Sequence, residues 1–186
     1  MRFTGLSITL ALTLAILGCD SEREKPAPLN TGGIDAAASK ITFVGSKDEG
    51  KHNGGFKTLT GSVTFDAAAL DKAAISVEID ATSLWSDDDK LTGHLKGADF
   101  FDVNAQPKAG FKSTLIEKTG EAYTLTGDLT IKGKTNKITA PATITSEGGK
   151  TTIKTSFKIN RFDYGIDYGK GQVHDEVSIA VELVTK

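Results

Sequence analysis

The chain has 186 residues, with 22 Lys and Arg against 24 Asp and Glu, a formal net charge of -2 and one cysteine. This length allows one domain or two small ones, and charged and hydrophobic fractions of 25% and 38% indicate a globular protein rather than a disordered one. The net charge excludes a strongly basic nucleic-acid binder. One cysteine excludes an internal disulfide and a thiolate zinc cluster. Because threonine (23 residues) favours strands and glycine (20 residues) favours turns, the composition indicates an all-β protein.

The N-terminus is typical of a signal peptide, because a basic residue precedes an apolar run over residues 6–17 that is too short to span a membrane comfortably. Gly18 directly before Cys19 resembles the lipobox of bacterial lipoproteins, in which the cysteine is acylated. We therefore expect a signal peptide over residues 1–18 and a lipidated Cys19 that anchors the protein to a membrane. The expected location is the bacterial cell envelope, facing the periplasm. The alternative is an ordinary secretory signal with an incidental cysteine.

The chain then divides into a linker and one domain. Residues 20–38 are polar and lack apolar periodicity, so residues 19–38 are expected to be the lipidated cysteine and a flexible tether. From residue 39 to 186 apolar and polar residues alternate, which indicates strands with one buried face. Eight strands are predicted, near residues 40–44, 59–65, 75–79, 109–115, 123–131, 138–144, 153–159 and 177–183.

Eight such strands can close into an antiparallel barrel or pack as a two-sheet sandwich. A closed barrel has no exposed edges and can enclose one small ligand. Several residues on the inward faces are small, and they either leave space inside or accommodate bulky neighbours: Gly61, Gly127, Ala140, Ala142 and Thr155.

One segment, residues 86–97, breaks the alternation and predicts a short helix between the third and fourth strands. Ser86 is a suitable N-cap, with Asp89 three residues later as in a capping box. Leu91 and Leu95 lie four residues apart on one face, and Gly97 can end the helix. The helix is expected to cover one end of the barrel.

The candidate catalytic residues are few. His52, His94 and His174 lack metal-ligand spacing, and a structural hydrogen bond is the expected role of each. General acid–base catalysis by His94 with Asp163 is the best enzymatic case. Because neither a nucleophile motif nor a metal accompanies this pair, we expect a protein that is not an enzyme and needs no cofactor or metal.

Arg161 and Asp163 continue the inward parity of the strand that ends near residue 159. If the strand extends that far, both side chains form a polar rim where Arg161 suits a ligand head group. The alternatives are a structural ion pair or a strand that has ended by Asn160. Because partly buried ion pairs are often architectural, the structural role is favoured.

Several strings together resemble the YceI-like family, the polyisoprenoid-binding, lipocalin-like periplasmic proteins. They are GGFKTLTGSVTFD (54–66), ISVEIDATSL (75–84), HLKGADFFDVNAQPKAGFKS (94–113), YTLTGDLTIKGKTNKIT (123–139) and INRFDYGI (159–166). The resemblance implies an eight-stranded antiparallel barrel with an elongated apolar cavity for a long isoprenoid or similar lipid. It places His94, Phe100, Phe101, Arg161, Asp163 and Gly165 at family-motif positions.

The expected function is therefore non-enzymatic binding or transport of a long-chain isoprenoid or similar lipid, with no nucleic-acid partner. The alternative is a membrane-tethered structural or protein-interaction barrel without a stable lipid ligand. The polar rim is expected at His94, Arg161 and Asp163. The inward apolar residues expected to face the ligand are Phe43, Phe56, Val63, Phe65, Ile75, Val77, Ile79, Phe101, Phe111, Leu125, Leu129, Phe157 and Ile159.

Overall fold

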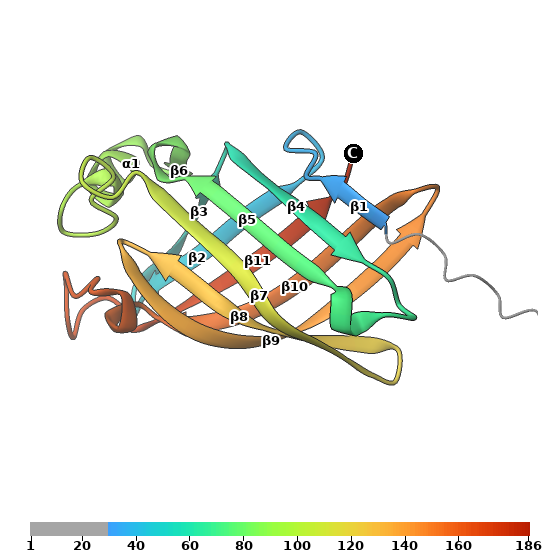
Figure 1. Cartoon of the computed structure of the whole chain (residues 1–186). Helices are drawn as coiled ribbons and strands as arrows, with labels where there is room; N and C mark the ends of the chain where they lie inside the picture. Colours follow the sequence, from blue (N-terminus) through green and yellow to red (C-terminus); the bar gives the residue numbers. More distant parts are fainter. Residues whose placement is uncertain (1–29) are drawn as a thin grey trace, which may run out of the picture.

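The computed structural model of the protein describes residues 30–186 (Figure 1). The predicted signal peptide and Cys19 lie outside these residues. The strands are β1 (Asn30–Gly33), β2 (Lys40–Lys47), β3 (Gly50–Phe56), β4 (Leu59–Phe65), β5 (Ala74–Asp80), β6 (Leu84–Ser86), β7 (Lys108–Thr119), β8 (Ala122–Ile131), β9 (Lys134–Glu147), β10 (Lys150–Asn160) and β11 (Glu176–Val184). One α-helix, α1 (Asp89–Lys96), and three 3-10 helices (Leu70–Lys72, Ala81–Ser83 and Arg161–Tyr164) complete the described chain.

All strands belong to one curled antiparallel sheet in the order β1-β4-β5-β7-β8-β9-β10-β11-β2-β3-β6. The eight predicted strands are present as β2, β4, β5 and β7 to β11, but the predicted number is too low, because β1, β3 and β6 also pair. Alternation does not reveal β3, which is polar and glycine-rich, or β6, which has three residues. β1 lies within the range predicted as a tether, where it pairs with β4 and is followed by the buried Ile34.

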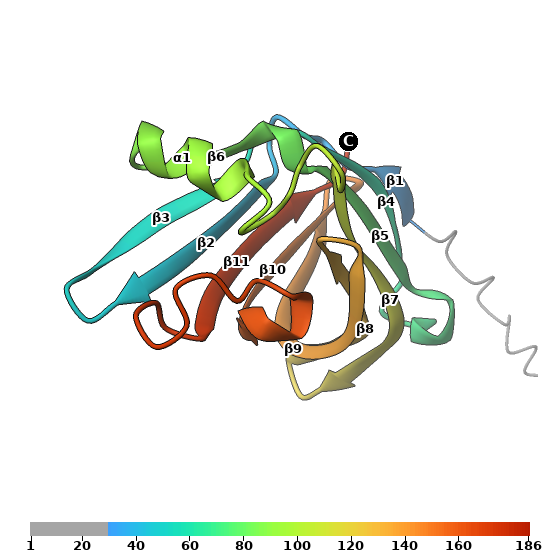
Figure 2. The same ribbon diagram turned by 90° about the vertical axis from the view of Figure 1, so that its left-hand side faces the viewer.

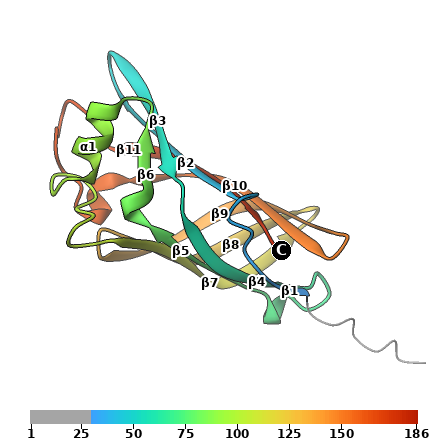
Figure 3. The ribbon, with the colours of Figure 1, turned by 90° about the horizontal axis from the view of Figure 1, so that it is seen from above.

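Two bends divide neighbouring strands without ending the sheet. Only Lys57 and Thr58 separate β3 from β4, and the 3-10 helix Ala81–Ser83 separates β5 from β6. The bends are bonded to each other, since the Lys57 N–H donates to the Ser83 carbonyl (3.3 Å) and the Asp80 N–H to the Thr58 carbonyl (3.1 Å). Seen from above, β3 runs on directly into β4 (Figure 3).

A β-bulge changes the face of β7. The pairing with β8 shifts between Ser113 and Leu115, and the extra residue inverts the inward and outward parity beyond it. Leu115, which unbroken alternation from Ala109 would place inward, is half exposed, whereas Ile116 is buried.

The helix α1 begins later than the sequence predicts. Its N-cap is Asp88, whose Oδ1 accepts from the Leu91 N–H at 2.8 Å. The predicted cap, Ser86, instead donates from Oγ to the Asp88 carbonyl at 2.8 Å. Gly97 ends the helix as expected. Within residues 30–186, no helix is long and apolar enough to cross a membrane.

The two ends of the curled sheet differ. At the end where β1 begins, hereafter the closed end, the interior is filled by a buried cluster that includes Val63, Phe65 and Tyr123. The rings of Phe65 and Tyr123 meet edge to face, with centroids 5.5 Å apart. The opposite end, hereafter the mouth, is surrounded by α1, the β2–β3 turn and residues 161–175 (Figure 2). The core therefore closes one end and leaves space toward the other.

Candidate functional site

The interior of the sheet contains an apolar cavity of about 390 Å³ that extends toward the mouth. Most of the predicted ligand-facing residues line it: Phe43, Phe56, Ile75, Val77, Ile79, Phe101, Phe111, Leu125, Leu129, Phe157 and Ile159. Val63 and Phe65 do not; they belong to the cluster that fills the closed end. The volume is in the range of small-molecule sites, about 300–1,000 Å³.

Many of the apolar residues that point inward near the mouth are only half buried. Phe157 and Ile159 of β10 and Val177 and Ile179 of β11 share this intermediate exposure and line the cavity. In a filled core, inward residues are almost completely buried, as Val63 is at 1% exposure. These walls consequently offer apolar surface to a ligand.

Three phenylalanines from different segments meet inside the cavity. The ring centroids of Phe43 and Phe56 lie 6.0 Å apart, those of Phe43 and Phe101 6.0 Å, and those of Phe56 and Phe101 5.7 Å. Such spacing is typical of favourable aromatic contact. The cluster joins β2 and β3 to the loop that follows α1.

The small inward residues have two different roles. A Cβ at Gly127 would collide with the Phe111 ring, and one at Gly54 with the Phe43 ring, so these glycines accommodate bulky neighbours. Ala140 and Thr155, in contrast, line the cavity. Both explanations offered for small inward residues therefore apply, at different positions.

Arg161 is buried, with 3% exposure, and its guanidinium holds the 161–175 segment together. Nε donates to the His174 carbonyl (3.1 Å), Nη1 to the carbonyls of Ile166 (2.8 Å) and Tyr168 (2.7 Å), and Nη2 to that of Val173 (3.0 Å). The favoured architectural role thus has a geometric basis, with backbone carbonyls as partners. Asp163 is not the partner; the nearest carboxylate is that of Asp175, 3.9 Å from Nη2.

The inward parity expected for Asp163 does not hold, because β10 ends at Asn160 and residues 161–164 form a 3-10 helix. Asp163 is exposed and outside the cavity lining. Its carboxylate has an electrostatic effect on the buried Tyr164: loss of hydration on burial, together with the charge of Asp163, raises the pKa of the Tyr164 hydroxyl to about 12.

Each histidine is paired with an aspartate near the mouth. His52 Nδ1 lies 2.8 Å from Asp87 Oδ1, His94 Nε2 lies 3.3 Å from Asp99 Oδ2, and His174 Nε2 lies 2.9 Å from Asp48 Oδ1. His52 and His94 line the cavity, whereas His174 lies in a polar groove on the outer surface. Among the residues that the structure describes, no three His, Cys, Asp or Glu side chains are grouped to hold a metal ion.

The mouth also contains aromatic residues that the sequence did not single out as cavity residues. The rings of His94, Phe100 and Tyr168 pack together, with centroids 4.7 to 5.2 Å apart, and all three residues line the cavity. Phe100 was identifiable only as a motif position. Tyr168 lies between β10 and β11, in a segment without alternating apolar residues. Arg161 holds it at the mouth by donating to its carbonyl, and no local sequence pattern predicts that bond.

The fold and the cavity together define a cavity-bearing, all-β domain whose interior is suited to an apolar molecule. Residues 33–185 match the model of the YceI-like domain, and the chain belongs to the YceI-like family. It is 36% identical over 138 residues to a UPF0312 protein of Pseudomonas putida (strain W619), covering 70% of this chain and 71% of that protein.

Solved structures share the fold. The crystal structure of Burkholderia cenocepacia BcnA superimposes with a TM-score of 0.78 at 32% identity, covering 82% of this chain and 99% of BcnA. A polyisoprenoid binding domain from Saccharophagus degradans, implicated in plant cell wall breakdown, superimposes with a TM-score of 0.68 over 85% of this chain and 98% of that domain. At 17% identity the second similarity concerns the fold alone.

Proposed function

We propose that the protein binds the chain of an isoprenoid or similar lipid inside the sheet, without catalysing a reaction. The observation that carries this proposal is the 390 Å³ cavity with half-buried apolar walls. Each methylene buried there gains about 0.8 kcal/mol, so a chain needs few polar contacts to bind. The fold shared with a polyisoprenoid binding domain supports the same ligand class.

We further propose that the curled sheet functions as a closed eight-stranded barrel. β3 pairs with β2 and β6, while β4, two residues later, pairs with β5 and β1. When β3–β4 and β5–β6 are each counted as one bent strand, and β1 as an addition at the closed end, eight strands surround the cavity. In a closed barrel, the bound lipid chain would have no free strand edge beside it.

The membrane attachment is also a proposal, and it rests on the sequence around Cys19. An acylated Cys19 would hold the protein on the periplasmic side of an envelope membrane, where apolar ligands are available. The mass of the N-terminal peptide of the mature protein tests it. We expect a peptide that begins at Cys19 and carries the additional mass of acyl chains. A peptide of unmodified mass would indicate a secreted protein without a lipid anchor.

A pair of tryptophan substitutions on β11 tests lipid binding. Ile179 faces the cavity and Ala180, its neighbour, is exposed on the outer face. Ile179→Trp is expected to occupy the cavity and abolish lipid retention, whereas Ala180→Trp should retain it. The measurement is native mass spectrometry of the gently extracted proteins, before and after incubation with farnesol.

Retention of lipid by the wild type and by Ala180→Trp, but not by Ile179→Trp, supports the cavity as the binding site. A wild-type protein that neither co-purifies with lipid nor takes up farnesol would contradict the proposal. In that case the interaction-module alternative would be preferred, and a partner captured equally by all three proteins would support it.

A further inference from the structure

The mouth contains a histidine, His52, that is bonded to an aspartate and lines the cavity, while half of its side chain is exposed. In β3, Phe56, Gly54 and His52 share the inward face, because side chains alternate along a strand. Phe56 and His52 both line the cavity. Opposite His52 in β2 is Gly45, and a Cβ there would meet nothing within 4 Å. Space for a ligand group therefore adjoins the imidazole of His52.

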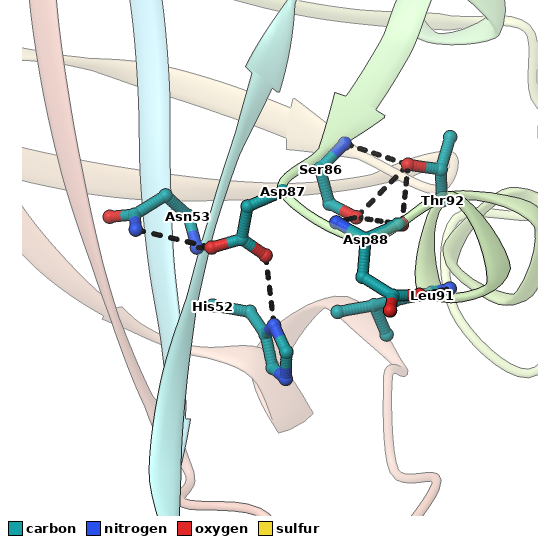
Figure 4. Close-up of polar contacts among 7 residues, drawn as sticks. All are labelled: His52, Asn53, Ser86, Asp87, Asp88, Leu91 and Thr92. Carbon is teal, nitrogen blue, oxygen red and sulfur yellow. Dashed lines mark hydrogen bonds and ion pairs between the residues drawn. The ribbon is translucent and has the colours of Figure 1, made fainter.

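Asp87 holds the His52 ring in place (Figure 4). Its Oδ1 lies 2.8 Å from His52 Nδ1, while its Oδ2 accepts from the backbone N–H of Asn53 at 2.7 Å and from Asn53 Nδ2 at 3.2 Å. The bond from the Asn53 backbone, and after it the bond with His52, lowers the pKa of Asp87. Asp87 is consequently an anion at neutral pH and can only accept hydrogen bonds.

This arrangement determines which nitrogen of His52 carries the proton. Because the Asp87 carboxylate accepts, Nδ1 must donate, and the neutral ring presents the lone pair of Nε2. Within residues 30–186, no hydrogen bond to Nε2 of His52 is formed. A ligand group beside Nε2 must therefore donate a hydrogen bond to be accepted there.

Several other polar side chains near the mouth are engaged. Arg161 donates to four backbone carbonyls. Ser86 Oγ bonds to the Asp88 carbonyl, and Ser46 Oγ to His174 Nδ1. Lys47 lies 3.6 Å from Glu49. His94 is bonded to Asp99 and packed against Phe100 and Tyr168.

We propose that His52, oriented by Asp87, is the head-group site of the cavity and selects lipids whose polar end is a hydroxyl. This inference rests on the proposed function, since the apolar chain must occupy the cavity for its head to reach His52. An ether, which lacks a donor, and an aldehyde, which only accepts, would both offer Nε2 no hydrogen bond. The selection is expected to be about three- to tenfold, the value of one hydrogen bond.

The test is competition between farnesol, its methyl ether and farnesal at equal concentrations, read as relative occupancy by native mass spectrometry. The wild type should favour farnesol about three- to tenfold. His52→Leu should bind all three without preference. His174→Leu removes a histidine that is also paired with an aspartate, but through Nε2 and outside the cavity, and it should keep the preference of the wild type.

Asp87→Asn provides a second test that leaves His52 in place. The asparagine oxygen can still accept from the Asn53 backbone, while its amide can donate to Nδ1 and thereby move the ring proton to Nε2. The preference should then shift from farnesol toward farnesal, which a loss of packing alone would not cause.

The outcomes separate the two proposals. If the wild type binds the three probes equally, chain binding stands and the head-group site is overturned. If the preference is lost in His94→Leu and kept in His52→Leu, the site is at His94 and the inference is wrong. If the wild type binds none of the probes, both the proposed function and this inference fail.

Discussion

At the scale of single residues, Arg161 is predicted to have a large effect on stability. Its guanidinium donates to the carbonyls of Ile166, Tyr168, Val173 and His174. Lysine keeps the charge but cannot reproduce the planar fork of donors. Arg161→Lys should lower the free energy of unfolding by about 3 kcal/mol, measured by urea denaturation.

The control is Lys158→Met, which removes an ion pair with Glu176 at 2.9 Å. Both side chains of that pair are largely exposed, so the loss should be below about 1 kcal/mol. Equal losses in the two variants would contradict the architectural role of Arg161.

Tyr164 makes stability depend on alkaline pH. Its pKa is raised to about 12 by burial and by Asp163, while the unfolded value is about 10. The protonated form is therefore favoured in the folded state, so its contribution is complete below pH 10 and is lost as the pH rises from about 10 to about 12. The unfolding free energy of the wild type should fall more steeply over this range than that of Tyr164→Phe. Parallel curves would contradict the assignment.

The residue scale also separates what the sequence could predict from what it could not. The inward parity of Phe43, Phe157 and Ile159 followed from alternation alone, and these residues line the cavity. The partners of Arg161 could not be predicted, because they are backbone carbonyls of a loop without periodicity. The pairing of His52 with Asp87 could not be predicted either. His52 lies within β3 and Asp87 directly after β6, and the pairing of these two strands brings them together.

At the scale of elements, the cap of α1 can be tested directly. Asp88 accepts from the Leu91 N–H at 2.8 Å, so Asp88→Ala should cost about 1 kcal/mol and speed hydrogen exchange of the Leu91 amide. Asp89→Ala removes the same charge from the same turn without removing the cap bond. It should cost about 0.3 kcal/mol through the helix dipole and leave that exchange nearly unchanged. Equal effects of the two substitutions would show that Asp88 is not the N-cap of α1.

Alternation predicted the strands that have one apolar face and missed those that do not. β3 supplies an edge for β2 and β6 through its backbone, and backbone pairing needs no apolar pattern. The bulge in β7 shows a second limit of prediction from alternation. One additional residue moves Ile116 inward and Leu115 outward, and no residue type in that part of the sequence indicates a bulge.

At the scale of the whole molecule, the filled closed end limits the length of chain that the cavity accepts. Along the series geraniol, farnesol, geranylgeraniol and longer alcohols, affinity should increase about fourfold per additional buried methylene and then level off. Phe65→Ala, which opens the closed end, should move this plateau to longer chains at a cost of about 3 kcal/mol in stability. Leu115→Ala, at an exposed site, is the control. A plateau unmoved by Phe65→Ala would place the limit elsewhere.

The described chain enters the sheet at Asn30, opposite the outermost β4 residue, Phe65, at the end away from the mouth (Figure 1). The ten residues between Cys19 and Asn30 reach at most about 35 Å when fully extended, whereas a strand as long as β9, with 14 residues, measures about 46 Å. A protein anchored through Cys19 would therefore be held at its closed end, with the length of the sheet between the anchor and the opening. Such an anchor would leave the opening free to meet a surface or a carrier other than the membrane that holds the protein.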